Sequence, residues 1–259
     1  MKLVTFNIRC DFGQDGENCF CRRRDLIAAK IRREQPDIIC FQEVLPHVAV
    51  WLKENLKGYY VIGCGRDVNL EDEQVSVAYR RDRVNLISMD TFWLSDEPYV
   101  PGSRYACQRI CPRVCTGAVF SYSGGPGKAY LFRLYNIHLD HMGGEARRLG
   151  LELILKRADR EPAFQNIPVI LAGDFNAEPD SPELAVLKSR REFTNVTEGI
   201  GVTYHGFEPE DMPERIDYIY AGAPFVCQSV EKWEDREGNV WLSDHYPICA
   251  VLEPGDCGE

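Results

Sequence analysis

Short apolar runs alternate with an amphipathic stretch at the beginning of the chain. Residues 3–8 and 37–41 are mainly apolar, as is typical of buried strands, and residues 23–35 between them have helical periodicity. Pro36 ends that helix. Another helix is expected over residues 47–55. The pattern therefore predicts a strand–helix–strand unit followed by a second helix.

The middle of the chain has the pattern of successive strands. They are expected at residues 59–63, 75–80, 84–89, 114–122 and 130–138. Glycine and proline within residues 123–127 predict a hairpin turn between the last two strands. Lys128 follows this Gly-rich segment, but the spacing of a phosphate-binding G-x-x-x-x-G-K-[ST] loop is absent. We therefore interpret the segment as a turn.

The last part of the chain again mixes helices and strands. A long amphipathic helix is expected over residues 145–160 and a short one near residues 181–187. Strands are expected at residues 168–172, 216–220, 225–230 and 247–252. The strand–helix–strand pattern of residues 4–43 is thus repeated by residues 134–174.

Two such units, combined with several antiparallel strands, favour an α/β architecture. Two mainly antiparallel sheets would pack face to face with the helices outside them, as a four-layer α/β/β/α sandwich. No low-complexity linker or change in composition divides the chain, so residues 1–259 are expected to form a single domain.

The composition, with 44% apolar and 27% charged residues, is that of a soluble globular protein. No run of about 18 apolar residues predicts a membrane span, and the chain opens on a strand pattern rather than a signal peptide, which favours a cytoplasmic location. The net charge of −10 lowers the expectation of a long nucleic acid as substrate, because proteins that hold such polymers usually present a basic face. We interpret the basic runs at residues 22–24 and 147–148 as solvated helix positions.

Eleven cysteines are present, and reduced thiols are the default for a cytosolic chain. Two loose groups stand out, Cys10, Cys19 and Cys21 and then Cys107, Cys111 and Cys115. Their spacing lacks the paired C-x₂-C units of common structural metal sites. A metal site made of cysteines is therefore disfavoured.

Polar residues recur at the ends of the apolar strands. They are Asn7, Glu43, His138, Asp174, Asn176, Asp217, Asp244 and His245. A carboxylate at a buried strand end is costly unless it is paired, hydrogen-bonded or bound to a metal. Each residue has an ordinary alternative when taken singly, such as a turn residue for Asn7 or a helix cap for Glu43. Their coincidence favours one polar site.

The residue types in this set suit the hydrolysis of a phosphate ester. Carboxylate and amide oxygens are ligands that Mg²⁺ or Mn²⁺ prefers. A bound metal ion polarises a phosphoryl oxygen and neutralises the charge that develops on it. An Asp–His pair supplies a base or a proton donor, and arginine supplies a bidentate phosphate contact.

Six short segments carry these polar residues. They are Thr5-Phe6-Asn7-Ile8, Phe41-Gln42-Glu43-Val44, Asn136-Ile137-His138-Leu139, Gly173-Asp174-Phe175-Asn176, Arg215-Ile216-Asp217-Tyr218-Ile219 and Ser243-Asp244-His245-Tyr246-Pro247. In content and order they resemble the motifs of the endonuclease/exonuclease/phosphatase superfamily. The resemblance extends from residue 4 to about residue 252 and implies a DNase-like sandwich and a metal-dependent hydrolase of phosphate esters.

The resemblance also implies a role for each matching residue. Glu43 is similar to the principal metal ligand, helped by Asn7 and Asp244, and the implied cofactor is Mg²⁺ or Mn²⁺. Asn7 is also expected to contact the substrate phosphate. Asp174 and Asn176 resemble the pair that orients the attacking water and contacts the phosphate.

Two histidines have counterparts in the same superfamily. His245 resembles its catalytic histidine, and Asp217 resembles the acid that orients that ring. His138 resembles a second histidine that contacts the scissile phosphate, with Glu73 as its expected partner in the phosphate-binding set. Arg113 matches an arginine that contacts the phosphate.

The implied mechanism is in-line attack of water without a covalent intermediate, with either Asp174 or His245 as the base. We expect a phosphatase or phosphodiesterase acting on a phosphorylated small molecule or a short, single-stranded nucleic acid, with no membrane and no stable protein partner. The alternative is a nuclease acting on DNA or RNA. A catalytically inactive binding module is disfavoured because Glu43 and the other catalytic positions are all filled. Arg9 either binds a substrate phosphate or forms an ion pair, and His141 either lines the same cleft or lies on the surface.

Overall fold

Two six-stranded sheets form the centre of the computed structural model, which describes residues 1–125, 128–160, 167–209 and 213–255. The first sheet has the order β11 (Phe225–Lys232), β14 (Ile248–Pro254), β1 (Lys2–Asn7), β2 (Ile38–Gln42), β4 (Val77–Arg80) and β3 (Tyr59–Ile62). The second has the order β5 (Val84–Trp93), β6 (Val114–Gly125), β7 (Lys128–His138), β8 (Val169–Asp174), β10 (Asp217–Gly222) and β9 (Phe193–Asn195).

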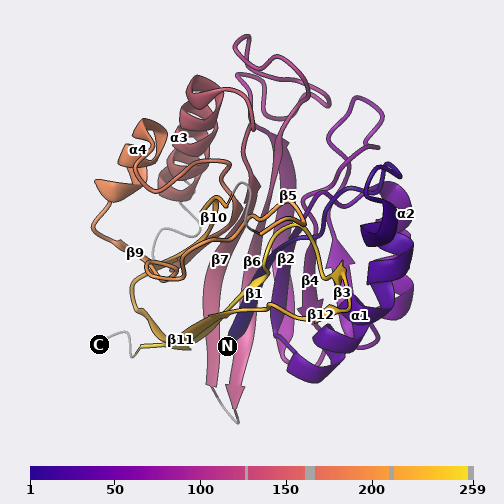
Figure 1. The fold of residues 1–259 in the computed structure, drawn as a ribbon. Helices are drawn as coiled ribbons and strands as arrows, with labels where there is room; N and C mark the ends of the chain where they lie inside the picture. Colours follow the sequence, from indigo (N-terminus) through magenta and orange to yellow (C-terminus); the bar gives the residue numbers. More distant parts are fainter. Residues whose placement is uncertain (126–127, 161–166, 210–212, 256–259) are drawn as a thin grey trace.

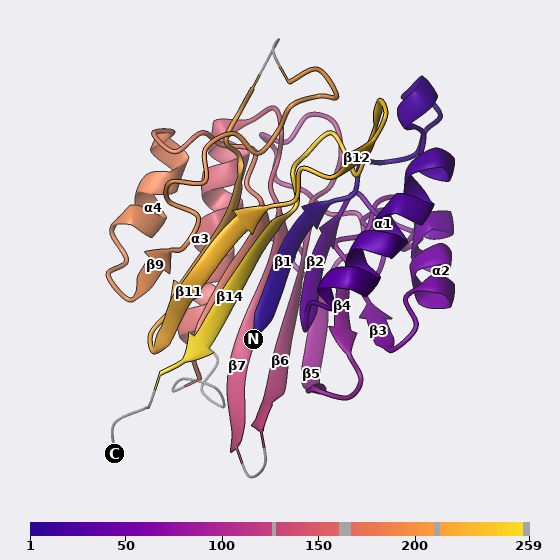
Figure 2. The ribbon, with the colours of Figure 1, turned by 60° about the horizontal axis from the view of Figure 1, so that its bottom comes forward.

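Helices cover the outer face of each sheet (Figure 1). On one side lie α1 (Phe20–Glu34) and α2 (Pro46–Asn55), and on the other lie α3 (Gly144–Arg160) and the short α4 (Ala185–Lys188), which continues from the 3₁₀ turn η3 (Pro182–Leu184). Figure 2 shows the same layers from below, with both sheets between the helices. The structure is therefore the α/β/β/α sandwich that the sequence predicts.

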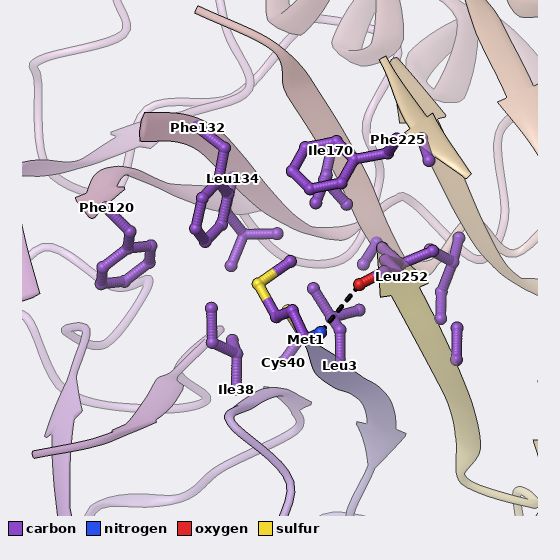
Figure 3. Packing of buried hydrophobic residues seen from close by; sticks show 14 of the residues in the cluster. Met1, Leu3, Ile38, Cys40, Phe120, Phe132, Leu134, Ile170, Phe225 and Leu252 are labelled. Atoms are coloured by element: carbon purple, nitrogen blue, oxygen red, sulfur yellow. Dashed lines mark hydrogen bonds between the residues drawn. The ribbon is translucent and has the colours of Figure 1, made fainter. Parts of the chain in front are cut away.

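Strand alternation explains why three apolar layers form. In β1, Leu3 packs into the core between the two sheets, whereas its neighbour Val4 packs toward α1 and α2. Figure 3 shows the core between the sheets, where Phe120, Phe132 and Leu252 surround the first residues of the chain. Complete burial of one such side chain contributes about 1.5–3 kcal/mol relative to exposure.

Each sheet contains one parallel pair of strands, and both pairs end at the same edge of the molecule. β1 and β2 pair in parallel across α1, with Asn7 beside Gln42. β7 and β8 pair in parallel across α3, with His138 beside Asp174. The strand orders of the two sheets also correspond, position by position. The repeat seen in the sequence is thus a repeat of structure, and it brings four strand ends together.

Most predicted elements are present, with differences at their ends. α1 begins at Phe20 rather than residue 23, and β5 continues to Trp93 rather than residue 89. The sequence did not predict the short strands β9, β12 (Arg236–Glu237) and β13 (Val240–Trp241). Two or three residues are too few to show the alternation of apolar and polar positions that indicates a strand. β6 and β7 pair antiparallel up to Gly125 and Lys128, so the hairpin is confirmed, while Pro126 and Gly127 lie outside the described residues.

None of the helices in the described part of the chain is both long and apolar enough to cross a bilayer. The cysteines in the same residues are free thiols, and Cys40, Cys115 and Cys249 are buried in strands. These three side chains serve as small apolar groups in the core.

Candidate active site

Asn7 links the two sheets at the edge where the parallel strands end. Its side chain is buried, and its Nδ2 donates to Oε1 of Glu43 and to Oδ2 of Asp174, each at 3.0 Å. Oδ1 of Asn7 accepts from the backbone N–H of Arg9 at 3.1 Å. Because Glu43 follows β2 and Asp174 ends β8, one amide holds carboxylates from both sheets.

Three residues of this edge have left-handed backbone conformations. Arg9, Glu43 and Asn176 have φ angles of 63°, 61° and 49°. Residues with side chains occupy this region at a cost, and such strain is concentrated at functional sites. Gly173 also has a positive φ, of 149°, and a Cβ there would lie 1.9 Å from the carbonyl oxygen of Ile137. Only glycine fits directly before Asp174.

Both oxygens of Asp174 are held in place. Oδ1 accepts from the backbone N–H of Asn176 at 2.8 Å, and Oδ2 accepts from Asn7. Nδ2 of Asn176 donates to the carbonyl oxygen of Leu139 at 3.0 Å, which ties the residue to the end of β7. Burial, together with the nearby charge of Asp217, raises the pKa of Asp174 to about 7.

The pKa of Glu43 is shifted in the opposite direction to that of Asp174. Its Oε2 accepts from the backbone N–H of Cys10 at 2.8 Å, and Oε1 accepts from Asn7. Burial acts to raise the pKa of Glu43, but these hydrogen bonds and the charge of His245 outweigh it and lower that pKa. Glu43 therefore stays ionised and available to a cation.

His245 and Asp217 form a buried pair. Nδ1 of His245 lies 2.8 Å from Oδ2 of Asp217, and its Nε2 lies 3.9 Å from Oδ2 of Asp174. Burial opposes the charge of the imidazole, but the carboxylates of Asp217, Asp244 and Asp174 outweigh that effect and raise the pKa of His245 to about 10. The ring is thus oriented by one acid and faces another.

Arg113 lies between two imidazole rings. Its Nη1 is 3.0 Å from Nε2 of His138, and its Nη2 is 3.0 Å from Nδ1 of His141. His138 is buried at the end of β7, whereas His141 is exposed. Burial and the charge of Arg113 hold the pKa of His138 well below its usual value. The sequence left open whether His141 lines the site or lies on the surface. In the structure it is exposed and also contacts Arg113.

The expected pairing of Glu73 with His138 is wrong. Glu73 is buried, but its two oxygens accept from Nη1 and Nη2 of Arg66, at 2.7 and 3.0 Å. The guanidinium offers a bidentate partner that an imidazole does not match. Burial and the charge of Glu43 raise the pKa of Glu73 to about 7, so Glu73 interacts electrostatically with a residue of the site.

Asp244 lies in an ion pair with Arg9. Its Oδ2 is 3.3 Å from Nη1 of Arg9, and its Oδ1 accepts from the hydroxyl of Ser243 at 3.1 Å. Arg9 also makes a bidentate contact with Asp15. Of the two alternatives stated for Arg9, the structure shows an ion pair, made with a carboxylate of the candidate site itself.

Two groups of side chains are close enough to share one cation. The ligand atoms of Glu43, His138 and Asp174 lie within 4.8 Å of one another, as do those of Asp174, Asp217 and His245. Hard oxygen donors from Glu43 and Asp174 fit a divalent ion such as Mg²⁺ or Mn²⁺. A cation would also offset the repulsion among these buried carboxylates.

Arg23 corrects the interpretation of residues 22–24 as solvated positions. Its side chain is completely buried, and it donates to the carbonyl oxygens of Ile8 at 2.7 Å, Leu242 at 2.9 Å and Asn18 at 2.6 Å. Ile8 follows Asn7, and Leu242 precedes the segment that carries Asp244. Arg23 therefore joins two segments that carry site residues, a function that no local sequence signal distinguishes from its two neighbouring arginines.

A cavity of about 780 Å³ lies next to the candidate site. Its wall includes Tyr246, the residue after His245. Phe207 and Trp241 also line it, together with the acids Glu208 and Glu234. Its volume is within the range of small-molecule sites, about 300–1,000 Å³.

Comparison with known proteins agrees with the fold. A model of the Endonuclease/Exonuclease/phosphatase family matches residues 4–245. The crystal structure of an endonuclease/exonuclease/phosphatase from Bacteroides vulgatus is 30% identical, with a TM-score of 0.89 over 98% of both chains. A mannosyl-6-phosphatase from Bacteroides thetaiotaomicron is 26% identical, with a TM-score of 0.86 over 98% of this chain and 99% of that chain. An uncharacterized protein of Acanthamoeba polyphaga mimivirus is 29% identical over 186 residues, which are 69% of this chain and 68% of that protein.

Proposed function

The chain belongs to the endonuclease/exonuclease/phosphatase family, whose members hydrolyse phosphate esters with a divalent metal ion, and we propose that it is itself such a hydrolase. The observation that carries the proposal is the link made by Asn7 between Glu43 and Asp174. This amide brings a candidate metal ligand of one sheet beside the water-orienting acid of the other. The buried pair of His245 and Asp217 also supports the proposal, because it places an imidazole next to Asp174.

In the proposed mechanism a water molecule attacks phosphorus in line with the leaving oxygen. Asp174 and Asn176 orient that water, and its proton passes to Asp174, because the raised pKa of His245 leaves that imidazole already protonated. The bond from phosphorus to the leaving oxygen breaks as the new bond to the water oxygen forms, and the leaving oxygen takes up the proton that His245 carries at Nε2. Arg113 holds the unesterified oxygens of the phosphoryl group, and His138, whose Nε2 accepts from Nη1 of Arg113, positions that guanidinium.

Glu43 is proposed to hold Mg²⁺ or Mn²⁺ with Asn7 and Asp244, the ligands that the resemblance implies, and Asp174 is close enough to Glu43 to share the ion. When bound, the ion supplies a Lewis acid that polarises a phosphoryl oxygen. Glu43 meets the requirement for an ionised ligand, since its hydrogen bonds and the charge of His245 lower its pKa. Arg9 neutralises Asp244 in the absence of another cation.

A small or single-stranded substrate is favoured over a long duplex. The net charge of −10 opposes the binding of a long polyanion, and the cavity beside Tyr246 is lined by two acids and a single arginine, Arg236. The similarity to a mannosyl-6-phosphatase supports the same size class, because that protein is named for a phosphorylated sugar.

The experiment is a hydrolysis screen with Mg²⁺, Mn²⁺ or EDTA. Substrates cover phosphomonoesters, phosphodiesters, nucleotides, sugar phosphates and oligonucleotides. We expect EDTA-sensitive turnover of a small ester, with slower turnover of oligonucleotides. Turnover confined to oligonucleotides would identify a nuclease instead, and absence of turnover on every class would contradict the proposed hydrolase.

A further inference from the structure

Arg113 is a buried cation that has no carboxylate partner among the described residues. It is 4% exposed, its terminal nitrogens contact His138 and His141, and its Nε has no hydrogen-bond partner. Other guanidinium groups of the region differ: Arg66 pairs with Glu73, and Arg9 with two acids. A buried charge with only neutral partners is costly unless an anion completes its surroundings.

The contact with Arg113 determines how the His141 ring is protonated. A guanidinium only donates hydrogen bonds, so Nδ1 of His141 must accept from Nη2 of Arg113. A neutral imidazole that accepts at Nδ1 carries its proton at Nε2. Because His141 is exposed, this N–H can donate to a bound ligand.

The backbone around His141 is held firmly. Asp140 is buried, and its Oδ1 accepts from the backbone N–H groups of Met142 and Gly143 at 3.0 and 2.7 Å. Arg147 donates to the carbonyl oxygen of Asp140 at 3.0 Å and is itself paired with Glu183. The segment before α3 therefore presents His141 in a fixed position, as a binding residue requires.

We propose that His141 is a substrate-binding residue which, with Arg113, makes the site selective for phosphomonoesters. This inference rests on the proposed function and names its substrate class. A monoester has three unesterified oxygens and a diester has two. The additional donor and the unpaired charge of Arg113 fit a third oxygen and the second negative charge that a monoester brings. Hydrolysis would release inorganic phosphate and an alcohol.

Two esters with the same leaving group test the selectivity. Para-nitrophenyl phosphate and para-nitrophenyl methyl phosphate are compared with the wild-type protein and the His141→Ala variant, in Mg²⁺. We expect the variant to raise KM for the monoester about 10- to 100-fold, the loss typical of a hydrogen bond to a charged group. KM for the diester should change less than about threefold. His141→Gln, whose amide nitrogen replaces the Nε2 donor, should recover part of the loss.

A binding measurement separates this inference from the proposed activity. Inorganic phosphate is titrated calorimetrically into each protein in Mg²⁺, and His141→Ala should weaken its Kd about 10-fold or more. Met142→Ala, an exposed neighbour in the same segment, is the control and should leave both Kd and KM unchanged.

Equal losses on both esters would overturn monoester selectivity and make His141 a residue that only positions Arg113. An unchanged Kd for phosphate would overturn its role in binding. If the wild-type protein hydrolysed neither ester nor any substrate of the screen, the proposed function would fail, and the phosphate titration would still support or reject the anion site.

Discussion

Nδ1 of His245 lies 2.8 Å from Oδ2 of Asp217, and both side chains are buried at the ends of neighbouring segments of the same edge. Asp217 begins β10 and is in register with Asp174, the last residue of β8. The orientation of His245 is therefore set by the same strand pairing that places Asp174. Sheet register determines the spacing of Asp217 and Asp174, whereas His245 lies in the segment between β13 and β14, where an isolated bridge joins it to Tyr204.

Asp217→Asn should reduce kcat by about 10²- to 10⁴-fold, the range that positioned acid–base groups contribute. Asparagine keeps the shape but removes the charge that holds the imidazole and stabilises its protonated form. Steady-state kinetics on the best substrate of the screen measure the effect. A loss that appeared only in KM would contradict the assignment of Asp217 as the residue that orients His245.

Arg23→Met should lower the free energy of unfolding by about 2–4 kcal/mol, because several buried carbonyl groups lose their donor together. Urea denaturation measures the change. Arg24→Met, at the next position of the same helix and exposed, is the matched control and should change stability by less than about 0.5 kcal/mol. Equal effects of the two variants would show that Arg23 does not join the two segments.

The contribution of His205 to stability should fall as the pH is lowered from about 6.5 to about 4. His205 is buried against Tyr246 and Trp241, and neither of its ring nitrogens has a hydrogen-bond partner in the described structure. Burial, with the charges of His245 and Lys232, lowers the pKa of His205 to about 4. Below pH 6.5 the unfolded chain binds a proton that the folded protein does not, so stability present above that pH is lost as the pH falls.

The size of this effect is limited to about 1.4 kcal/mol per pH unit for one proton. Thermal unfolding between pH 7 and pH 4 measures it, with His205→Phe as the comparison because phenylalanine cannot titrate. As the pH falls, the wild-type protein should lose stability relative to the variant, because only the wild type carries the imidazole of His205. Parallel curves for the two proteins would contradict a neutral, buried His205.

The sheets and the edge that carries the site were predictable because both depend on short-range patterns. Runs such as residues 3–8 are mainly apolar, since they are covered on both faces, and polar residues at the ends of several such runs together favour a site. The two strand–helix–strand units then bring the ends of β1 and β7 to one edge. The placement of Asn7 and Asp174 together follows from that topology.

The contacts that the sequence did not predict depend on loop conformations and on the direction in which individual side chains point. The partner of Glu73 is Arg66, seven residues away in a segment without regular periodicity, so no pattern distinguished it from His138. Three successive arginines at residues 22–24 share one composition, and only the helix phase determines that Arg23 is buried. The position of His141 required the structure for the same reason, because it lies in the segment between β7 and α3.

The most direct test of the proposed hydrolase compares Asp174→Asn with Asp180→Asn on the best substrate, in Mg²⁺ and in EDTA. Asp180 is a fully exposed aspartate in the segment that follows β8, so its variant controls for the chemical change alone. The proposal predicts EDTA-sensitive turnover in the wild-type protein and in Asp180→Asn, and a loss of at least about 10²-fold in Asp174→Asn. Undiminished turnover in Asp174→Asn would contradict the assignment of this edge as the active site.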